Sequence, residues 1–402
     1  MELKCALQTY DWGRRGTESV VATLVKAANA EFVVEEDKAY AELWMGTHPN
    51  GPSCLKIDGS SLKDYIEENR QVLGNDADGK TLEELPFLFK ILSVGKALSI
   101  QAHPDKKRAE RLHLQQPQVY KDSNHKPELA IALGPFEAFC GFRPINEIRH
   151  YIEVLPELRA VIGSSESKNV LHATEDDEAF LKTCFEGILS QRPEIVAVQL
   201  SALIERLSNL DEPDREFFHA SLLERLHKDY PGDVGCLGVY LFNCVTLEAG
   251  EAIYIAANEP HAYLSGDCVE CMACSDNVVR AGLTPKPKDV PTLLEMLTYS
   301  CEPVSSKHFQ PVRQDECTEI FRPPVRDFAV AKITITDERA TYDLIPRATA
   351  SILLIVEGKG KIASSKILDR GSVLFISANE KLTIAVSRHP VLMFQAFANV
   401  VD

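Results

Sequence analysis

Three segments that lie far apart in the sequence carry side chains suited to bind a metal ion. Residues two apart on a strand project from the same face, so Ser99, Gln101 and His103 are expected side by side if their segment is a strand. Residues 124–128 and 259–263 add further imidazole and carboxylate groups. Two imidazoles, a carboxylate and an amide oxygen make a competent zinc site whose net charge of about +1 can polarise a carbonyl oxygen. No short motif contains these groups, so a hydrogen-bonded structural role stays open for each histidine.

The charge of the chain limits its partners. A formal net charge of −16 over 402 residues argues against nucleic acid or an anionic membrane as a partner. It would also repel a phosphorylated ligand, so a site for one must be locally positive. Residues 101–126 meet that condition with six basic and three acidic side chains, although solvated surface charges are the alternative reading.

Composition and cysteine usage indicate a cytoplasmic globular protein. Hydrophobic residues make up 45% of the chain, and no apolar run is long enough to cross a bilayer. The first residues have no secretory signal, and the 11 cysteines are scattered singly, which favours reduced thiols. We expect a soluble monomer of two or three domains.

Several strings identify a family resemblance. They are residues 10–13 (YDWG), 42–49 (ELWMGTHP), 99–106 (SIQAHPDK), 124–128 (NHKPE) and the long block 258–286. They resemble the strings of type I phosphomannose isomerases, and the resemblance covers residues 10–143 and about 236–299. It implies a cupin-type barrel and interconversion of mannose 6-phosphate and fructose 6-phosphate, which feeds mannose into GDP-mannose synthesis and glycosylation.

The same resemblance implies one zinc ion per chain. Its ligands would be Gln101, His103, Glu128 and His261, the groups that the charge argument makes plausible.

Such a reaction moves a proton between two carbons through an enediol, so it needs a base and a cation near the oxygens. Arg280 is the candidate cation because a guanidinium stays charged and grips two oxygens; an ion pair with Asp276 is the alternative. Glu270 and Lys126 are candidates for proton transfer, and the identity of the base stays open, with a histidine or a metal-bound water also conceivable.

The sugar and its phosphate need their own contacts. Ser99 and Lys90 are predicted to hold the phosphate, and Lys126 and Lys286 suit either phosphate contact or proton handling. Asp276 completes the predicted substrate-binding set. Each lysine has a solvated surface position as its alternative reading.

The elements that position these residues are mainly strands. Short apolar runs broken by Gly, Pro, Asn and Asp predict strands in residues 1–144, whereas helical spacing of apolar residues dominates residues 145–234. This pattern predicts a mainly β fold with an inserted α-helical domain, and the family resemblance implies that the β part forms two cupin-type, jelly-roll barrels. The catalytic zinc-binding barrel would comprise 1–144 and 235–310, and a metal-free barrel would comprise 311–402.

An internal repeat supports the second barrel. Residues 247–259 and 368–380 share six identities in thirteen positions, including a turn glycine and an Asn-Glu pair. Where the first copy continues to His261 the second has Leu382, which cannot bind zinc. Cys268, Cys271 and Cys274 read as a metal motif, but we interpret them as core-filling thiols.

Two other functions use the same scaffold. A non-catalytic sugar-phosphate-binding cupin would not need the full metal set. A metal-dependent cupin oxygenase would need a tight His-x-His, which this chain lacks, and the glutamine suits redox-inert zinc better than iron.

Overall fold

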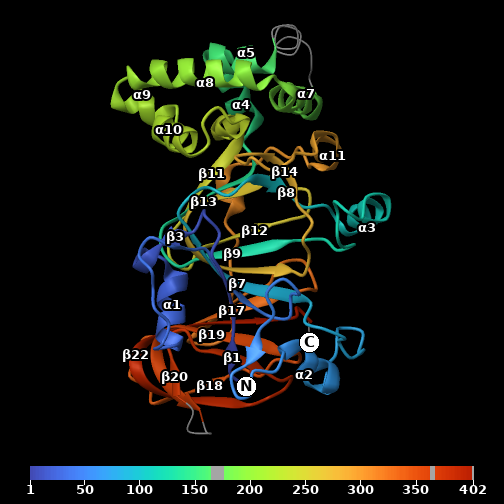
Figure 1. Ribbon diagram of the computed structural model, residues 1–402, viewed down its shortest axis with the longest axis vertical. Coiled ribbons are helices and arrows are strands. Elements are labelled where there is room, and N and C mark those ends of the chain that lie inside the picture. The colour runs from blue at the N-terminus through green and yellow to red at the C-terminus, as the bar shows by residue number, and fades with distance from the viewer. Residues whose placement is uncertain (164–175, 363–366, 401–402) are drawn as a thin grey trace.

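The computed structural model describes residues 1–163, 176–362 and 367–400. The helices of residues 145–229 gather at one end, a ten-stranded sheet lies in the middle, and an eight-stranded sheet lies at the other end (Figure 1). Within the described residues, no helix is long and apolar enough to cross a membrane.

The ten-stranded sheet is built from both sides of the helical block. Its strands are β2 (Ala6–Gln8), β5 (Glu42–Met45), β7 (Phe87–Val94), β8 (Ile100–Ala102), β9 (Glu128–Ala132), β10 (Phe136–Phe142), β11 (Phe242–Leu247), β12 (Ala252–Ile255), β13 (His261–Ala273) and β14 (Val279–Gly282). Two short pairs join it, β1 (Leu3–Lys4) with β6 (Cys54–Leu55) and β3 (Arg14–Arg15) with β4 (Ala39–Tyr40).

Strand β13 organises this sheet because it changes partners along its length. Its first half pairs with β10 and β8, and its second half pairs with β7 and β9. The change falls at Gly266, whose φ of +108° and closeness to the Pro135 carbonyl oxygen leave no room for a side chain. The bend brings His261 at the start of β13 and Glu270 near its end into one sheet with β7, β8 and β9.

The eight-stranded sheet uses the C-terminal part of the chain. It contains β15 (Val312–Arg313), β16 (Thr318–Phe321), β17 (Ala329–Ile335), β18 (Thr341–Leu344), β19 (Ser351–Ile362), β20 (Ile367–Asp369), β21 (Val373–Ile376) and β22 (Leu382–Phe397). The predicted fold class, mainly β with a helical insertion and two cupin-type units, is confirmed. Among the described residues the strand pairings form open paths rather than complete rings.

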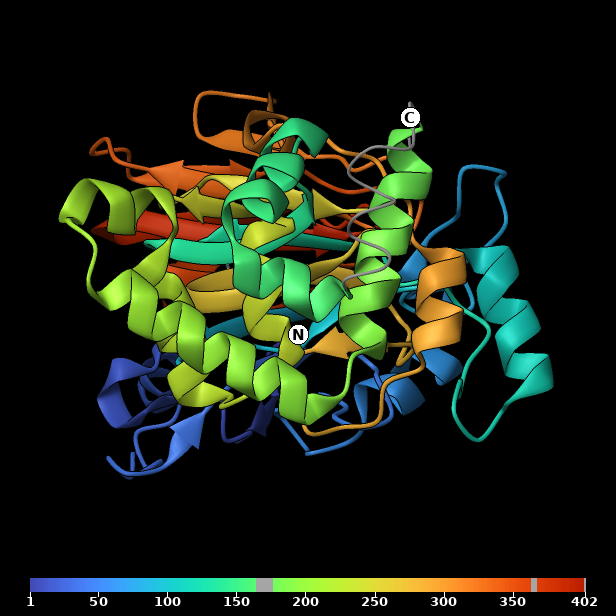
Figure 2. The same cartoon turned by 90° about the horizontal axis from the view of Figure 1, so that it is seen from above.

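The helical insertion covers one end of the ten-stranded sheet, as Figure 2 shows. Its helices are α4 (Ile145–Val154), α5 (Pro156–Ile162), α7 (Asp177–Ser190), α8 (Pro193–Ser208), α9 (Glu212–Phe217) and α10 (Ala220–Asp229). Proline in the first turn suits the starts of α5 and α8, and the Asp176 side chain caps α7. The apolar faces pack in one core with Phe142 and Phe242 of the sheet. Among the described residues, the α-helices outside the insertion are α1 (Val20–Ala28), α2 (Leu62–Glu68), α3 (Lys106–Gln115) and α11 (Val290–Met296).

A second core joins the two sheets. Phe87 and Phe89 of β7 lie in the same buried cluster as Ile352 and Phe375 of the C-terminal sheet. The N-terminal segment adds an antiparallel bridge between Glu2 and Leu374. The domain division at 310 and 311 therefore remains a prediction, since the two sheet units share buried apolar surface.

The internal repeat is visible in the backbone. Gly250 and Gly371 have φ of +91° and +81°, and Asn258 and Asn379 have φ of +65° and +59°. A left-handed asparagine is uncommon outside turns, so its recurrence at matching positions marks the same turn in both units.

The repeat also aligns the two units residue by residue. The amide of the left-handed asparagine donates to the carbonyl oxygen of His103 in the first unit and of Arg347 in the second, at 2.7 Å in both. The strand before that turn pairs with Glu128 in the first unit and with Ser351 in the second. By this alignment, Arg347 takes the position of His103, Ser351 that of Glu128, and Leu382 that of His261.

Candidate functional site

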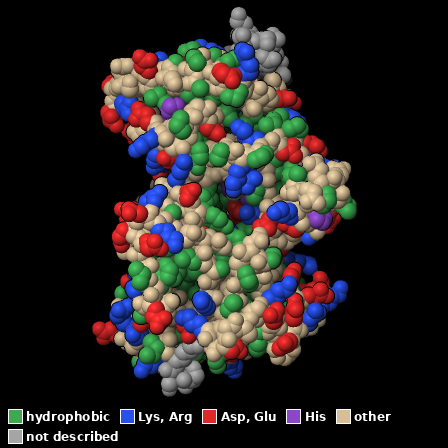
Figure 3. Space-filling view, viewed as in Figure 1, with side chains coloured by type: hydrophobic (Ala, Val, Ile, Leu, Met, Phe, Trp, Pro, Cys, Tyr) green, Lys and Arg blue, Asp and Glu red, His purple; other side chains and the backbone are tan. Residues whose placement is uncertain are grey.

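A cavity of about 890 Å³ opens beside β7, β8, β13 and β14. Figure 3 shows a hollow midway along the molecule with basic side chains gathered near its rim. Nine of the eleven predicted site residues line the cavity, namely Lys90, Ser99, Gln101, Lys126, Glu128, Glu270, Asp276, Arg280 and Lys286. The other two, His103 and His261, are buried and contact the carboxylate of Glu128.

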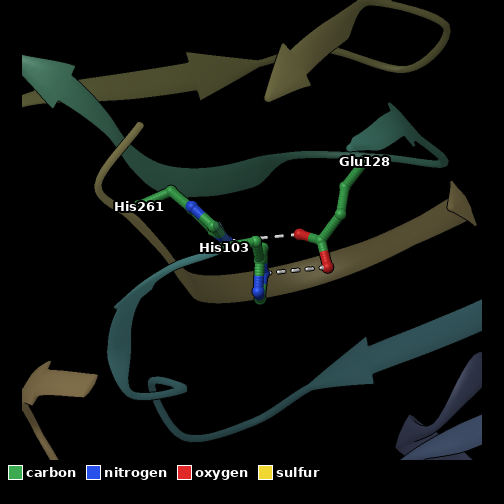
Figure 4. Close-up of side chains that lie close together, drawn as sticks. All are labelled: His103, Glu128 and His261. Atoms are coloured by element: carbon green, nitrogen blue, oxygen red, sulfur yellow. Dashed lines mark ion pairs between the residues drawn. The ribbon is translucent and has the colours of Figure 1, made fainter. Parts of the chain in front are cut away.

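His103, Glu128 and His261 converge on one point (Figure 4). The Nε2 atoms of His103 and His261 lie 3.3 and 3.2 Å from the two carboxylate oxygens of Glu128. One ligand atom from each residue lies within 4.8 Å of the other two. The side chains are exposed by 2% or less. This is the geometry and the donor chemistry of a buried divalent-cation site.

Backbone carbonyl groups orient both imidazoles. The Nδ1 atom of His103 lies 2.6 Å from the Asn277 carbonyl oxygen, and that of His261 lies 2.9 Å from the Glu259 carbonyl oxygen. A carbonyl oxygen only accepts, so Nδ1 carries the proton and Nε2 presents a lone pair. Burial and the nearby Lys126 cation lower the pKa of His103 to about 4, which keeps its imidazole neutral.

The facing atoms are all acceptors. His103 Nε2, His261 Nε2 and Glu128 Oε2 are buried and have no hydrogen-bond partner. Lone pairs of neutral imidazoles and a carboxylate repel one another, and leaving buried polar atoms unpaired costs roughly 1–3 kcal/mol each. A cation between them satisfies all three, so the residues present fit a metal ion.

Gln101 stands next to this cluster through strand register. It is the pairing partner of His261 on β13 and of Arg280 on β14. Its amide oxygen accepts a hydrogen bond from the Ser99 hydroxyl at 3.4 Å. Gln101 therefore lines the cavity in register with His261, and its role as a fourth ligand remains a prediction.

Lys90 lies in a carboxylate network rather than free in the cavity. Its ammonium group is 3.0 Å from Glu270 and 3.6 Å from Glu42. Burial alone would lower the pKa of Lys90, but Glu270, Glu42 and Glu128 raise it overall. The Lys90 ammonium also lies 5.1 Å from the centre of the Trp44 ring, so it is a fixed cation.

Glu270 and Glu128 lie in contrasting surroundings. Burial raises the pKa of Glu270, with Glu128 adding to the shift and Lys90 opposing it. For Glu128, burial is outweighed by the Lys126 cation 3.2 Å away and by His103, so its pKa falls well below the usual range. The two buried carboxyls therefore differ in proton affinity, which is higher for Glu270 than for Glu128.

The remaining predicted residues differ in their partners. Asp276 is 3.4 Å from His48 and accepts a hydrogen bond from Asn50 at 3.0 Å, so it is not the ion-pair partner considered for Arg280. In the described part of the chain, the Arg280 and Lys286 side chains form no ion pair. Burial lowers the pKa of Arg280.

Sequence reasoning did not select several polar cavity residues, among them Glu42, Lys96, Tyr230 and Tyr263. Tyr263 stands two residues after His261 on β13, and Glu42 belongs to a string that carries the family resemblance, so both had a signal. Lys96 and Tyr230 had none, because their proximity depends on tertiary structure.

The three cysteines of the Cys-x-x-Cys-x-x-Cys pattern go to different places. Cys268 and Cys271 are buried in separate apolar cores, and Cys274 packs against a third cluster. Positions three apart on a strand face opposite sides, so these thiols do not converge on one ion.

The fold and the site define a cupin-type protein with a polar cavity and a His-Glu-His centre. Residues 1–145 match the family model of the type I phosphomannose isomerase catalytic domain, and residues 160–242 match that of its helical insertion domain. The chain belongs to the type I phosphomannose isomerase family and is an isomerase, as the sequence predicted.

Relatives and solved structures agree. The chain is 44% identical to the mannose-6-phosphate isomerases of Bos taurus and Homo sapiens, over 98% of this chain and 97% of each relative. The apo form of the Salmonella typhimurium mannose 6-phosphate isomerase superposes with a TM-score of 0.83 at 31% identity, and 99% of each chain is covered. A mannose 6-phosphate isomerase bound with zinc and yttrium has a TM-score of 0.83 at 30% identity, again over 99% of each chain.

Proposed function

We propose that this chain interconverts mannose 6-phosphate and fructose 6-phosphate through an enediol, with one zinc ion bound by Gln101, His103, Glu128 and His261. The observation that carries the proposal is the convergence of three buried, unpaired acceptor atoms beside a polar cavity. The names of the relatives support the substrate, and the zinc-bound neighbour supports the metal.

A zinc ion held by Gln101, His103, Glu128 and His261 would supply a positive charge able to polarise the carbonyl group of the open-chain sugar. Arg280 donates to the sugar oxygens as negative charge develops on them, since its guanidinium has no competing ion pair within the described residues and its neighbour in register is Gln101.

Proton transfer between C1 and C2 falls to Glu270 or Lys126. Glu270 suits the task because its raised pKa brings a buried carboxyl closer to neutrality, and Lys90 holds its orientation at 3.0 Å. Lys126 is the alternative, and its ion pair with Glu128 places its ammonium beside the metal centre.

Ser99, Lys90, Lys286 and Asp276 form the proposed substrate-binding set. Lys286 is exposed at the cavity and has the freedom to reach a phosphate. The ion pairs of Lys90 compete with a phosphate, so its contribution is a nearby positive charge that offsets the carboxylates.

We also propose a cellular location and a metabolic role for the chain. A cytoplasmic monomer with these properties would supply a precursor of GDP-mannose, and neither nucleic acid nor a membrane enters the reaction. We also propose the domain division 1–144 with 235–310, 145–234 and 311–402.

A coupled assay for fructose 6-phosphate formed from mannose 6-phosphate tests the proposal directly. We expect turnover that a chelator abolishes and that added zinc restores. Undiminished turnover after verified removal of zinc contradicts the metal's role. Tight binding of mannose 6-phosphate with no product would instead favour a sugar-phosphate-binding protein, and iron-dependent oxygen consumption would favour an oxygenase.

A further inference from the structure

The cavity is lined by buried carboxylates at one side and by more exposed lysines at another. The buried carboxylates Glu42, Glu128 and Glu270 lie with Lys90 and Lys126, and these two lysines are paired to them. Two more exposed cations, Lys96 and Lys286, also line the cavity. Across residues 1–163, 176–362 and 367–400, these two side chains form no ion pair with a carboxylate.

This division orients a sugar phosphate. A phosphate dianion is repelled by the buried carboxylates and attracted by cations that have no carboxylate of their own. The carbonyl end of an open-chain hexose 6-phosphate lies at the opposite end from its phosphate. The phosphate therefore belongs at the exposed end when the carbonyl faces the His-Glu-His centre.

Lys96 is fixed at this exposed end by a residue of the helical insertion. Its ammonium lies 4.2 Å from the centre of the Tyr230 ring. Tyr230 follows α10 directly, and its hydroxyl donates to the Ala97 carbonyl oxygen at 2.6 Å, a contact that spans 133 residues of sequence. The hydrogen bond fixes the Tyr230 ring, and the cation–π contact with that ring restricts Lys96, so less side-chain entropy is lost when Lys96 binds an anion.

Lys96 lies at the junction of two cavities. A second cavity of about 600 Å³ lies between the helical insertion and the sheet, and Lys96, Tyr230, Thr284 and Pro285 line both cavities. Lys288 lines only the second. Lys96 thus stands where the two cavities meet.

We propose that Lys96, held against Tyr230, binds the substrate phosphate together with Lys286, and that the helical insertion takes part in substrate selection through this contact. The proposal rests on the function proposed above and adds to it a phosphate contact that involves the insertion.

The first experiment separates binding from chemistry. Lys96→Gln should raise KM for mannose 6-phosphate about tenfold with kcat within about twofold, since a contact to a remote, non-reacting group acts equally in ground and transition states. Lys96→Arg should restore most of the loss. Lys288→Gln is the matched control, because it makes the same charge change outside the first cavity and should leave KM unchanged.

The second experiment does not depend on turnover. Mannitol 6-phosphate has no carbonyl group and cannot be isomerised, so calorimetry gives its Kd directly. We expect Lys96→Gln to weaken mannitol 6-phosphate about tenfold and to leave unphosphorylated mannitol unchanged. Tyr230→Leu should weaken it less than Lys96→Gln, and Tyr230→Phe, which keeps the ring, should weaken it least.

The outcomes keep the two proposals apart. Wild-type protein that binds mannitol 6-phosphate without isomerising mannose 6-phosphate refutes the catalytic function but leaves the phosphate contact to the Kd comparison. Equal Kd values for wild type and Lys96→Gln overturn the phosphate contact, whatever the activity. Equal losses in Lys96→Gln and Lys288→Gln would show a general charge effect and overturn it as well.

Discussion

Replacing Arg280 should separate metal binding from catalysis. The guanidinium is half-buried, burial lowers its pKa, and within the described residues it has no carboxylate partner. Folding therefore gains nothing from this charge, and Arg280→Met should change stability by less than about 0.5 kcal/mol.

Its catalytic contribution should be large by comparison. Loss of one charged donor to a developing oxyanion typically lowers kcat by about 100- to 1000-fold, or roughly 3–4 kcal/mol. Arg280→Lys keeps the charge but loses the two-pronged donor, so its kcat should fall between those of Arg280→Met and the wild type. Zinc content should stay at the wild-type level in both variants.

Glu128→Gln is the contrasting variant. Its carboxylate faces both imidazoles at 3.2 and 3.3 Å, so we expect zinc to be lost together with activity. The assay combines steady-state kinetics, zinc content by elemental analysis and thermal denaturation on the same samples. If Arg280→Met loses zinc, or if its Tm falls by more than about 5 °C, the side chain is structural and the reasoning fails.

Two further predictions concern metal stoichiometry and pH. Elemental analysis should give one zinc per chain, and Cys268→Val with Cys274→Ala should leave that value and the activity intact; a second zinc lost on these substitutions would contradict separate core positions. Burial and the Arg143 cation lower the pKa of His219 to about 4. The unfolded state therefore binds more protons than the folded state between about pH 4 and 6.5. The free energy of unfolding should decrease as the pH falls through that window. After allowance for solvent screening, His219→Gln should flatten this dependence by about 1 kcal/mol in denaturant titrations; an unchanged slope would refute the assignment.

The candidate site was predictable where chemistry is encoded locally. Predicting the alternation of Ser99, Gln101 and His103 required only the period of a β-strand. In the structure, Gln101 lies in β8, and Ser99 and His103 directly precede and follow that strand. The turn before His261 could be predicted because its asparagine and glutamate recur in the second unit.

The rest depended on partners that no local pattern specifies. Lys90 was predicted as a phosphate contact, yet its two carboxylates come from β5 and β13, and only sheet pairing brings them together. Tyr230 reaches Ala97 from the end of the helical insertion. The shared core of Phe87 and Phe375 likewise joins segments nearly 300 residues apart, and apolar periodicity identifies a buried face but not the surface that covers it.

The second sheet unit has the same backbone frame as the candidate metal site but lacks its donor residues. It keeps the glycine turn, the left-handed asparagine and the amide-to-carbonyl hydrogen bond of 2.7 Å, although Arg347, Ser351 and Leu382 stand at the donor positions. A frame that forms equally well around an arginine, a hydroxyl and an aliphatic chain owes its shape to backbone geometry. Ligation in the first unit therefore need not serve as a folding staple, unlike that of small zinc modules that collapse only around their ion.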